Sequence, residues 1–226
     1  HVDYTIIYYE NLLKLRPNYL NYQFNLAMNL RRKNNNEDYV RAQNIFKYIV
    51  KKHPELAEAK MQLAITFQLQ GRIGDAINVY NEIIKARNHH NSEIVEMDEV
   101  FVQSLTNEIR QTVMVNLGAA HQESGHFKKA IYLYRRNLEE LPSDARAWNN
   151  LGSSLWQIGD AQGSVDAYMK AIDIDPDSSE AYVNLGVAYY EYGKLQDCAD
   201  AYNKAYSLTK NDGLLIRLAT MTLPIM

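Results

Sequence analysis

Five carboxamide side chains recur in this sequence at one position, immediately before a leucine. They are Asn25, Gln62, Asn116, Asn150 and Asn184. A carboxamide carries two N–H donors and one carbonyl acceptor, which match the alternating N–H and C=O groups of an extended peptide backbone. Amides repeated along an array could therefore hold a peptide without reading its side chains. The alternative is that they only solvate the surface on which they lie.

The residue types that most often perform catalysis do not form a recognisable set. His89 and His90 are adjacent and would point in different directions on a helix, whereas His121 and His126 are five apart, a poor spacing for one metal ion. Glycine-rich phosphate loops, nucleophile elbows and cysteine pairs are lacking in the sequence. We nominate no catalytic, cofactor-binding or metal-binding residue, and we expect that this chain is not an enzyme by itself.

Composition argues against several classes of protein. The chain has 226 residues, 46% hydrophobic and 23% charged, and a formal net charge of −3, so we expect neither a nucleic-acid partner nor disorder. No apolar run approaches the roughly 20 residues of a membrane-spanning helix, and we expect no membrane partner. The single cysteine cannot form an internal disulfide, which fits a cytoplasmic location. Because the chain starts with His1, we expect the native amino terminus to lie upstream.

A repeat of 34 residues organises the elements that must position the amides. Three segments, starting at Leu117, Leu151 and Leu185, align without gaps. Each begins with Leu-Gly, has a second glycine seven residues later and a tyrosine nine residues beyond that. Pro142 and Pro176 close two of these segments. Two weaker copies precede them, and the strongly patterned segments all have helical spacing, so we predict a helical repeat protein.

This pattern resembles the tetratricopeptide repeat family, whose unit is a pair of helices. The resemblance implies an all-α, right-handed superhelix of five repeats, in which the first helices line a concave groove. The groove would contain the five amides together with Asn149 and Ser153. The predicted organisation is a second helix of a truncated repeat at 1–19, repeats at 20–56, 57–90, 111–144, 145–178 and 179–212, an insertion at 91–110, and a C-terminal helix at 213–226 as a candidate junction to a following domain.

Recurring small residues predict how the helices of each pair meet. Gly118, Gly152 and Gly186 lie inside helical patterns, where glycine costs roughly 1 kcal/mol relative to alanine, so we expect a close approach by a neighbouring helix. A second set should end the first helices in a left-handed conformation: Gly71, Gly125, Gly159 and Gly193. A third position is shared by Ala76, Ala130, Ser164 and Cys198. This position predicts that the cysteine is buried rather than reactive.

Two segments outside the repeats are also expected to be helical. The insertion has apolar residues at a spacing that favours an amphipathic extension of the next helix, and we expect it to cover the core rather than to recruit a partner. These residues are Val100, Phe101, Leu105 and Ile109. Residues 1–16 resemble a second helix whose first helix is absent, so we expect one apolar face to be exposed. That face contains Ile6, Tyr9, Leu12 and Leu13.

The amide series is similar to the inner surface of the repeat arm in O-linked N-acetylglucosamine transferases and their SPINDLY relatives. The tail NDGLLIRLATMTLPIM, residues 211–226, is similar to the junction at which bacterial SPINDLY-type glycosyltransferases enter their transferase region. This resemblance implies glycosylation of protein serine or threonine from a nucleotide sugar. None of the family's transferase residues lies within the 226 residues, so no catalytic residue can be assigned.

We therefore predict a module that binds an extended peptide or protein segment in its groove, as the substrate-selecting arm of a SPINDLY-like glycosyltransferase. The alternative is a free-standing scaffold or adaptor that assembles a multiprotein complex. Only Arg31, Arg32 and Arg146 are candidates for holding a terminal carboxylate, so the basic cluster that this needs is not apparent, and capture of a chain end is the less favoured mode. Neither role requires a cofactor, and the sequence does not indicate an oligomeric state.

Overall fold

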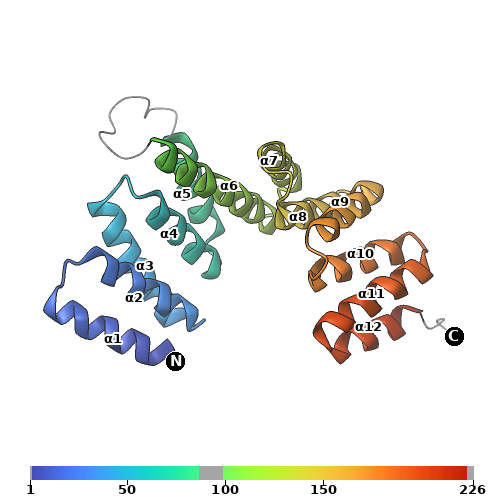
Figure 1. The fold of residues 1–226 in the computed structure, drawn as a ribbon, viewed down its shortest axis with the longest axis horizontal. Coiled ribbons are helices and arrows are strands. Elements are labelled where there is room, and N and C mark those ends of the chain that lie inside the picture. The colour runs from blue at the N-terminus through green and yellow to red at the C-terminus, as the bar shows by residue number, and fades with distance from the viewer. Residues whose placement is uncertain (1, 87–98, 223–226) are drawn as a thin grey trace. The chain divides into compact units, whose positions relative to one another are not determined.

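A computed structural model describes the backbone of residues 2–86 and 99–222, and the side-chain surroundings of 2–85 and 107–217 (Figure 1). Every regular element in these ranges is an α-helix, which confirms the prediction of an all-α fold of helix pairs. The chain divides into two compact units, unit 1 from His1 to Ser124 and unit 2 from Gly125 to Met226. The boundary falls inside the predicted repeat 111–144, between its two helices.

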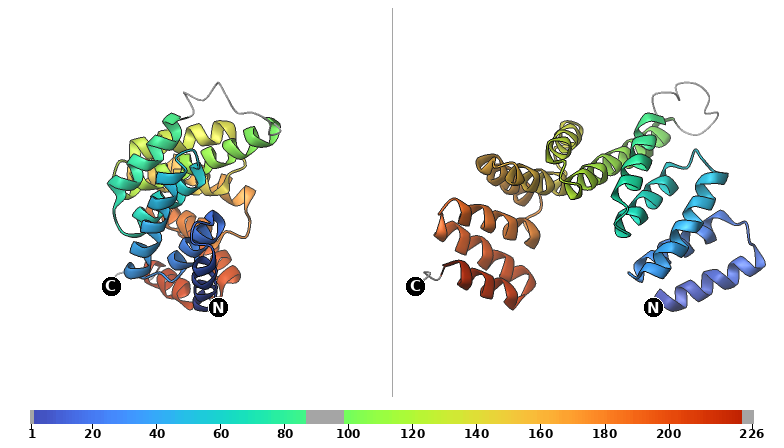
Figure 2. Two further views of the ribbon diagram at one scale, coloured as in Figure 1. Left: turned by 90° about the vertical axis from the view of Figure 1, so that its left-hand side faces the viewer. Right: turned by 180° about the vertical axis from the view of Figure 1, so that it is seen from behind.

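Each unit is a stack of helices in chain order. Unit 1 contains α1 (Val2–Leu15), α2 (Leu20–Arg32), α3 (Asn36–Lys52), α4 (Ala57–Leu69), α5 (Ile73–Ala86) and α6 (Glu99–Glu123). Unit 2 contains α7 (Phe127–Glu140), α8 (Ala145–Gln157), α9 (Ala161–Ile174), α10 (Ser179–Glu191), α11 (Leu195–Thr209) and α12 (Asp212–Thr222). Within a unit each helix packs beside the next, and the views in Figure 2 show the same order. In addition α4 contacts α6, and α8 contacts α10, so the first helices of successive pairs also meet.

Left-handed residues end the first helices, as the sequence predicts. After α4, Gly71 has a φ of 72°, and the amide of Arg72 donates to the carbonyl of Phe67 at 2.9 Å. This bond satisfies a carbonyl that the helix end would otherwise leave free. The φ values of Gly125, Gly159 and Gly193 are 74°, 82° and 71°. After α2 the same conformation is adopted by Asn34, with a φ of 56°, a role that the sequence analysis did not single out.

The predicted close approach occurs between the two helices of one pair. A Cβ atom added at Gly152 in α8 would lie 2.7 Å from the ring of Tyr168 in α9. The equivalent distance from Gly186 in α10 to the ring of Tyr202 in α11 is 2.8 Å. Both tyrosines are almost fully buried: the exposed fraction is 4% for Tyr168 and 0% for Tyr202. Glycine is therefore required at these positions because the ring takes the space of a side chain.

The small-residue position is buried in all four helices that carry it. Ala76, Ala130, Ser164 and Cys198 each have 0% exposure. Burial also raises the pKa of the Cys198 thiol, which disfavours the reactive thiolate. The prediction that Cys198 is buried is confirmed.

The sequence analysis assigned the exposed apolar face of α1 to the wrong residues. Ile6 is buried, and Tyr9 lies against Tyr22 of α2 with the ring centroids 6.3 Å apart. Leu12 and Leu13 are half-buried. The named face is the one that packs on α2. The apolar residues that are exposed lie elsewhere on α1: Tyr4, Ile7, Tyr8 and Leu15.

The flanking segments are helical where the structure describes them. Helix α6 begins at Glu99 and continues to Glu123, so the expected extension of the following helix is confirmed from that residue onward. Residues 91–98 of the predicted insertion lie outside the described residues. At the other end, α12 runs from Asp212 to Thr222 and packs on α11, whereas the last four residues of the predicted C-terminal helix are outside the described range.

Gly152→Leu should destabilise unit 2 by about 1–3 kcal/mol, because the new side chain overlaps the buried ring of Tyr168. Urea unfolding followed by circular dichroism measures the loss. Gly74→Leu is the matched control: Gly74 lies in α5 with nothing within 4 Å of its added Cβ, so leucine should be neutral or stabilising there. Equal stability of the two variants would contradict the close approach.

Candidate peptide-binding surface

The five predicted amides lie on the first helix of successive pairs. Asn25, Gln62 and Asn116 belong to α2, α4 and α6 in unit 1, and Asn150 and Asn184 belong to α8 and α10 in unit 2. The structure therefore divides the series between two units. It also gives the amides different surroundings, although the sequence pattern treats them alike.

Gln62 is held inside unit 1 rather than presented to solvent. Only 7% of the residue is exposed, and its Oε1 accepts a hydrogen bond from Nη1 of Arg31 in α2. Its Nε2 donates to Oε1 of Glu58, one turn earlier in α4, at 2.9 Å. The amide thus links a guanidinium to a carboxylate. The expectation that this side chain faces an open groove is wrong, because both ends of the amide have partners within the protein.

Asn116 supports a buried tyrosine. Its side chain is hydrogen-bonded to the hydroxyl of Tyr80, which in turn donates to Oε1 of Gln68 at 2.7 Å. Nε2 of Gln68 donates to Glu123 at 3.1 Å. Burial raises the pKa of Tyr80, so the phenol stays protonated at neutral pH. Asn116 therefore satisfies a polar atom of the core, a role distinct from ligand binding.

Asn25 is tied to its own helix. Its Nδ2 donates to the carbonyl of Asn21 at 2.9 Å, whereas its side-chain carbonyl accepts no hydrogen bond from the described residues. One acceptor on α2 is therefore available to a ligand.

In unit 2 three side chains form a short hydrogen-bonded chain between α8 and α10. Nδ2 of Asn184 donates to Oδ1 of Asn149 at 3.0 Å, and Nδ2 of Asn149 donates to Oε1 of Glu180 at 3.0 Å. Asn149 is 7% exposed. This residue, which the sequence analysis placed in the groove, is a bridge that fixes the orientation of Asn184.

Asn150 is the amide with the greatest freedom to bind a ligand. It is half-buried on α8 and makes no hydrogen bond to any residue in the described part of the chain. On the adjacent α10, Oδ1 of Asn184 is also without a described donor, because only its Nδ2 is used. Two neighbouring helices therefore present two donors and two acceptors. We call Asn149, Asn150, Ser153 and Asn184 the amide surface.

Ser153 is also part of the amide surface and connects it to the core. The hydroxyl of Tyr168 donates to Oγ of Ser153 at 3.1 Å. Burial raises the pKa of Tyr168, so this donor is neutral at physiological pH. In the next repeat the equivalent of Ser153 is Val187, and the buried hydroxyl of Tyr202 makes no hydrogen bond within the described residues. The repeats therefore share a shape but differ in polar contacts.

Two acidic residues that bind the predicted amides, one in each unit, were missed by the sequence analysis. Glu58 and Glu180 occupy equivalent positions, four residues before Gln62 and Asn184, and each accepts a hydrogen bond from an amide. Residues four apart share one face of a helix, so this spacing could have identified them.

Two aromatic residues were also missed. Trp156 and Tyr190 are half-buried and lie three residues after Ser153 and Val187, at a spacing that places them on the same helical face. Their rings would add apolar contact area beside the amides.

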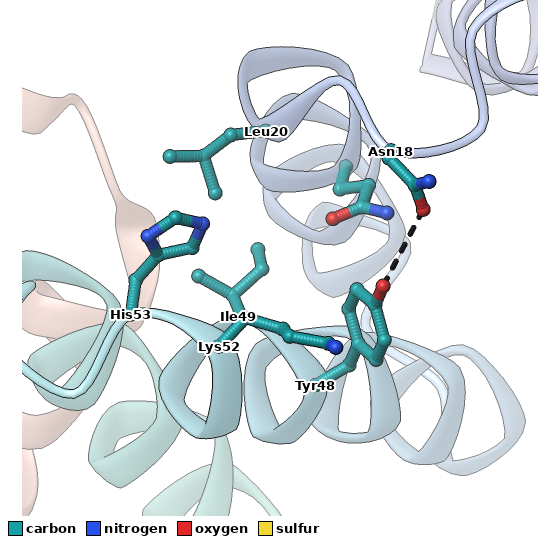
Figure 3. Close-up of a pocket in the computed structure, with 7 residues that line it drawn as sticks. Asn18, Leu20, Tyr48, Ile49, Lys52 and His53 are labelled. Carbon is teal, nitrogen blue, oxygen red and sulfur yellow. Dashed lines mark hydrogen bonds between the residues drawn. The ribbon is translucent and has the colours of Figure 1, made fainter.

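A small pocket lies in unit 1, away from the predicted amides. It has a volume of about 260 Å³ and is lined by seven residues, all drawn in Figure 3: Asn18, Leu20, Gln23, Tyr48, Ile49, Lys52 and His53. The hydroxyl of Tyr48 lies 3.4 Å from Oδ1 of Asn18. Pockets for drug-sized ligands usually have about 300–1,000 Å³, so this one is below the usual range. It contains none of the predicted groove residues.

The described residues contain no group of three or more His, Cys, Asp or Glu side chains placed to hold a metal ion. None of the helices in the described ranges is both long and apolar enough to span a membrane. His89 and His90 lie outside the described residues.

Solved structures with a similar fold are helical repeat proteins. MamA 41-end from Desulfovibrio magneticus RS-1 is 18% identical, with a TM-score of 0.65, and the match covers 84% of this chain and 95% of MamA. A chain of the APC/C hetero-tetramer Cut9-Hcn1 is 16% identical with a TM-score of 0.72, and the match covers 98% of this chain and 39% of that chain. YrrB, described as a TPR protein with an unusual peptide-binding site, is 15% identical with a TM-score of 0.60, covering 94% and 97%.

Comparison with curated protein sequences gives no match. Family models do match: a TPR repeat model over residues 157–193, and tetratricopeptide repeat models over 31–91 and 179–212. Together these segments span more than half of the chain and include helices from both units. With the helix pairs, the left-handed turn glycines and the contacts between glycine and tyrosine, they show that this chain belongs to the tetratricopeptide repeat family.

Proposed function

We propose that this chain binds an extended protein segment along the face formed by its first helices. The observation that carries the proposal is the pair of open amide groups in unit 2, the whole side chain of Asn150 and Oδ1 of Asn184. A segment lying across α8 and α10 would place backbone N–H and C=O groups opposite these atoms. Because the contacts are to the backbone, recognition would tolerate different ligand sequences.

The fold supports this proposal in a general way. Tetratricopeptide arrays expose long surfaces made of repeated positions, which suit binding of proteins and peptides. YrrB, which has a similar fold, is described as having an unusual peptide-binding site. The helices themselves are a scaffold, and the described residues provide no recognisable catalytic set.

The amides would have different roles in this proposal. Asn150 and Asn184 would contact the ligand, whereas Asn149 would hold Asn184 in place through the hydrogen bond between them. Gln62 and Asn116 already bind partners inside unit 1, so their main contribution would be to stability. This proposal assigns ligand contacts mainly to Asn150 and Asn184, whereas the sequence analysis predicted equivalent contacts from all five amides.

Two larger roles are compatible with such a surface. In the first, the chain is the substrate-selecting arm of a SPINDLY-like protein glycosyltransferase, as the amide series and the tail suggest. In the second it is a scaffold or adaptor in a multiprotein complex. The complete reading frame beyond Met226 separates them: alternating strand and helix patterns over several hundred residues would support the arm, and a stop or further repeats would support the scaffold.

The double variant Asn150→Ala/Asn184→Ala should lose about tenfold or more in peptide affinity, because each side chain supplies hydrogen bonds worth roughly 0.5–1.5 kcal/mol. The probe is a peptide selected from a random library by the unaltered chain, and the measurement is fluorescence polarisation. Asn203→Ala, at an exposed asparagine of α11, is the matched control and should bind normally. Unchanged affinity of the double variant would assign these amides to solvation alone.

Replacing an amide that has partners within the protein should lower the stability of the fold more than replacing Asn150. Gln62→Ala and Asn149→Ala should each lower the free energy of unfolding by about 1–3 kcal/mol, because they leave polar partners unsatisfied. Asn150→Ala should change it by no more than about 0.5 kcal/mol, because it breaks no contact with described residues. Urea denaturation measures all three variants. A large loss for Asn150→Ala would show that this side chain holds the repeats together.

A further inference from the structure

Arg31 stands at the end of α2 with its side chain directed to the next first helix. Its Nη1 donates to Oε1 of Gln62 in α4, and the residue is half-buried. No hydrogen bond joins the guanidinium to the final carbonyl groups of α2, so its role is not simply to cap that helix. Burial lowers the pKa of Arg31, although the group stays charged at neutral pH.

No carboxylate among the described residues forms a hydrogen bond or an ion pair with the guanidinium of Arg31. Glu58 contributes a favourable charge interaction, but its carboxylate accepts a hydrogen bond from the other end of the Gln62 amide. Arg32 follows directly and adds positive charge. Among the described residues Arg31 forms no ion pair, and a partly buried cation without a counter-charge is unfavourable.

Three other cations of unit 1, in contrast, have carboxylate partners among the described residues. Lys33 lies 2.9 Å from Asp3 and 3.4 Å from Asp38. Arg41 pairs with Glu10 and with Asp38. Arg72 pairs with Asp75. Each of these three cations has an ion pair within unit 1, whereas Arg31, beside the amide series, has none among the described residues.

We propose that Arg31 anchors an aspartate or glutamate side chain of the protein segment that unit 1 binds. The proposal rests on the proposed function, since it assumes that the first helices carry the ligand. A guanidinium has five N–H donors in a planar fork that fits a carboxylate with two parallel hydrogen bonds, and that of Arg31 makes one hydrogen bond to the described residues. The fixed amide of Gln62 holds the fork in position for this contact.

An internal acidic side chain fits better than the end of a chain. A terminal carboxylate needs several donors arranged around it, and Lys33, two residues further along the chain, is already paired with two aspartates. Arg32 is exposed and is not held in a fixed orientation by any hydrogen bond within the described residues. One oriented guanidinium provides one anchoring contact, which a single side chain can use.

The test begins with random peptide segments displayed inside a carrier protein, so that no chain terminus is available. The unaltered chain should enrich segments with Asp or Glu at one fixed position. Arg31→Gln should lose this enrichment, whereas Arg32→Gln, which removes the same charge one residue away, should retain it. Failure of the unaltered chain to enrich acidic residues, or their persistence with Arg31→Gln, would overturn the proposal.

A selected peptide then tests the contact without depending on the folding of a variant. Replacing its conserved Glu by Gln should weaken binding to the unaltered chain about tenfold or more, and binding to Arg31→Gln by less than about twofold. Arg31→Lys should retain part of the preference, because the charge remains but the fork is lost. Equal effects of the peptide change on the unaltered chain and on Arg31→Gln would rule out the pairing.

The variants in the two units distinguish the two proposals. Loss of acidic enrichment in Arg31→Gln, combined with normal binding by Asn150→Ala/Asn184→Ala, would support the anchor and reject the amide contacts. Loss of binding in the asparagine variant without any acidic enrichment would do the reverse. A library that yields no bound segment would contradict both.

Discussion

The contact between a glycine on the first helix and a tyrosine on the second fixes the geometry of a pair. Gly152 meets the ring of Tyr168, and Gly186 meets the ring of Tyr202, at distances that exclude any larger side chain. Because the ring of Tyr168 passes so close to Gly152, its hydroxyl reaches Ser153, the next residue of the first helix. The packing of the core thus determines where the first helix can offer a polar partner to the tyrosine.

The same position of the first helix serves two purposes in this protein. In unit 1 the amides of Gln62 and Asn116 connect neighbouring side chains and satisfy a core hydroxyl. In unit 2 Asn150 is open, and Asn184 has one open end. Amides that recur at one position of the repeat therefore do not all have the same chemical surroundings. The neighbours at each repeat decide whether an amide is available.

The repeat pattern in the sequence predicted the parts of the structure that follow local rules. The turn at Gly71 and the close approach at Gly152 could be predicted because a left-handed turn and a crowded helix each demand a particular residue type. Polar partners could not be predicted in this way. Arg31 and Gln62 are 31 residues apart, and so are Asn149 and Glu180, so their bonds depend on how successive helices pack. The buried state of the amides follows from those distant contacts.

Val187 occupies the position in the repeat of Tyr202 that Ser153 occupies in the repeat of Tyr168. This difference has a consequence for the cooperativity of unfolding. The hydroxyl of Tyr202 is buried without a hydrogen bond to the described residues, whereas that of Tyr168 is satisfied by Ser153. In a linear array each repeat depends mainly on its neighbours, so the cost falls on the pair formed by α10 and α11 rather than on the whole unit. Local opening should therefore start more easily in this pair than in the one before it. A difference in one polar contact between two repeats can thus change the order in which their helix pairs unfold, although both pairs have the same fold.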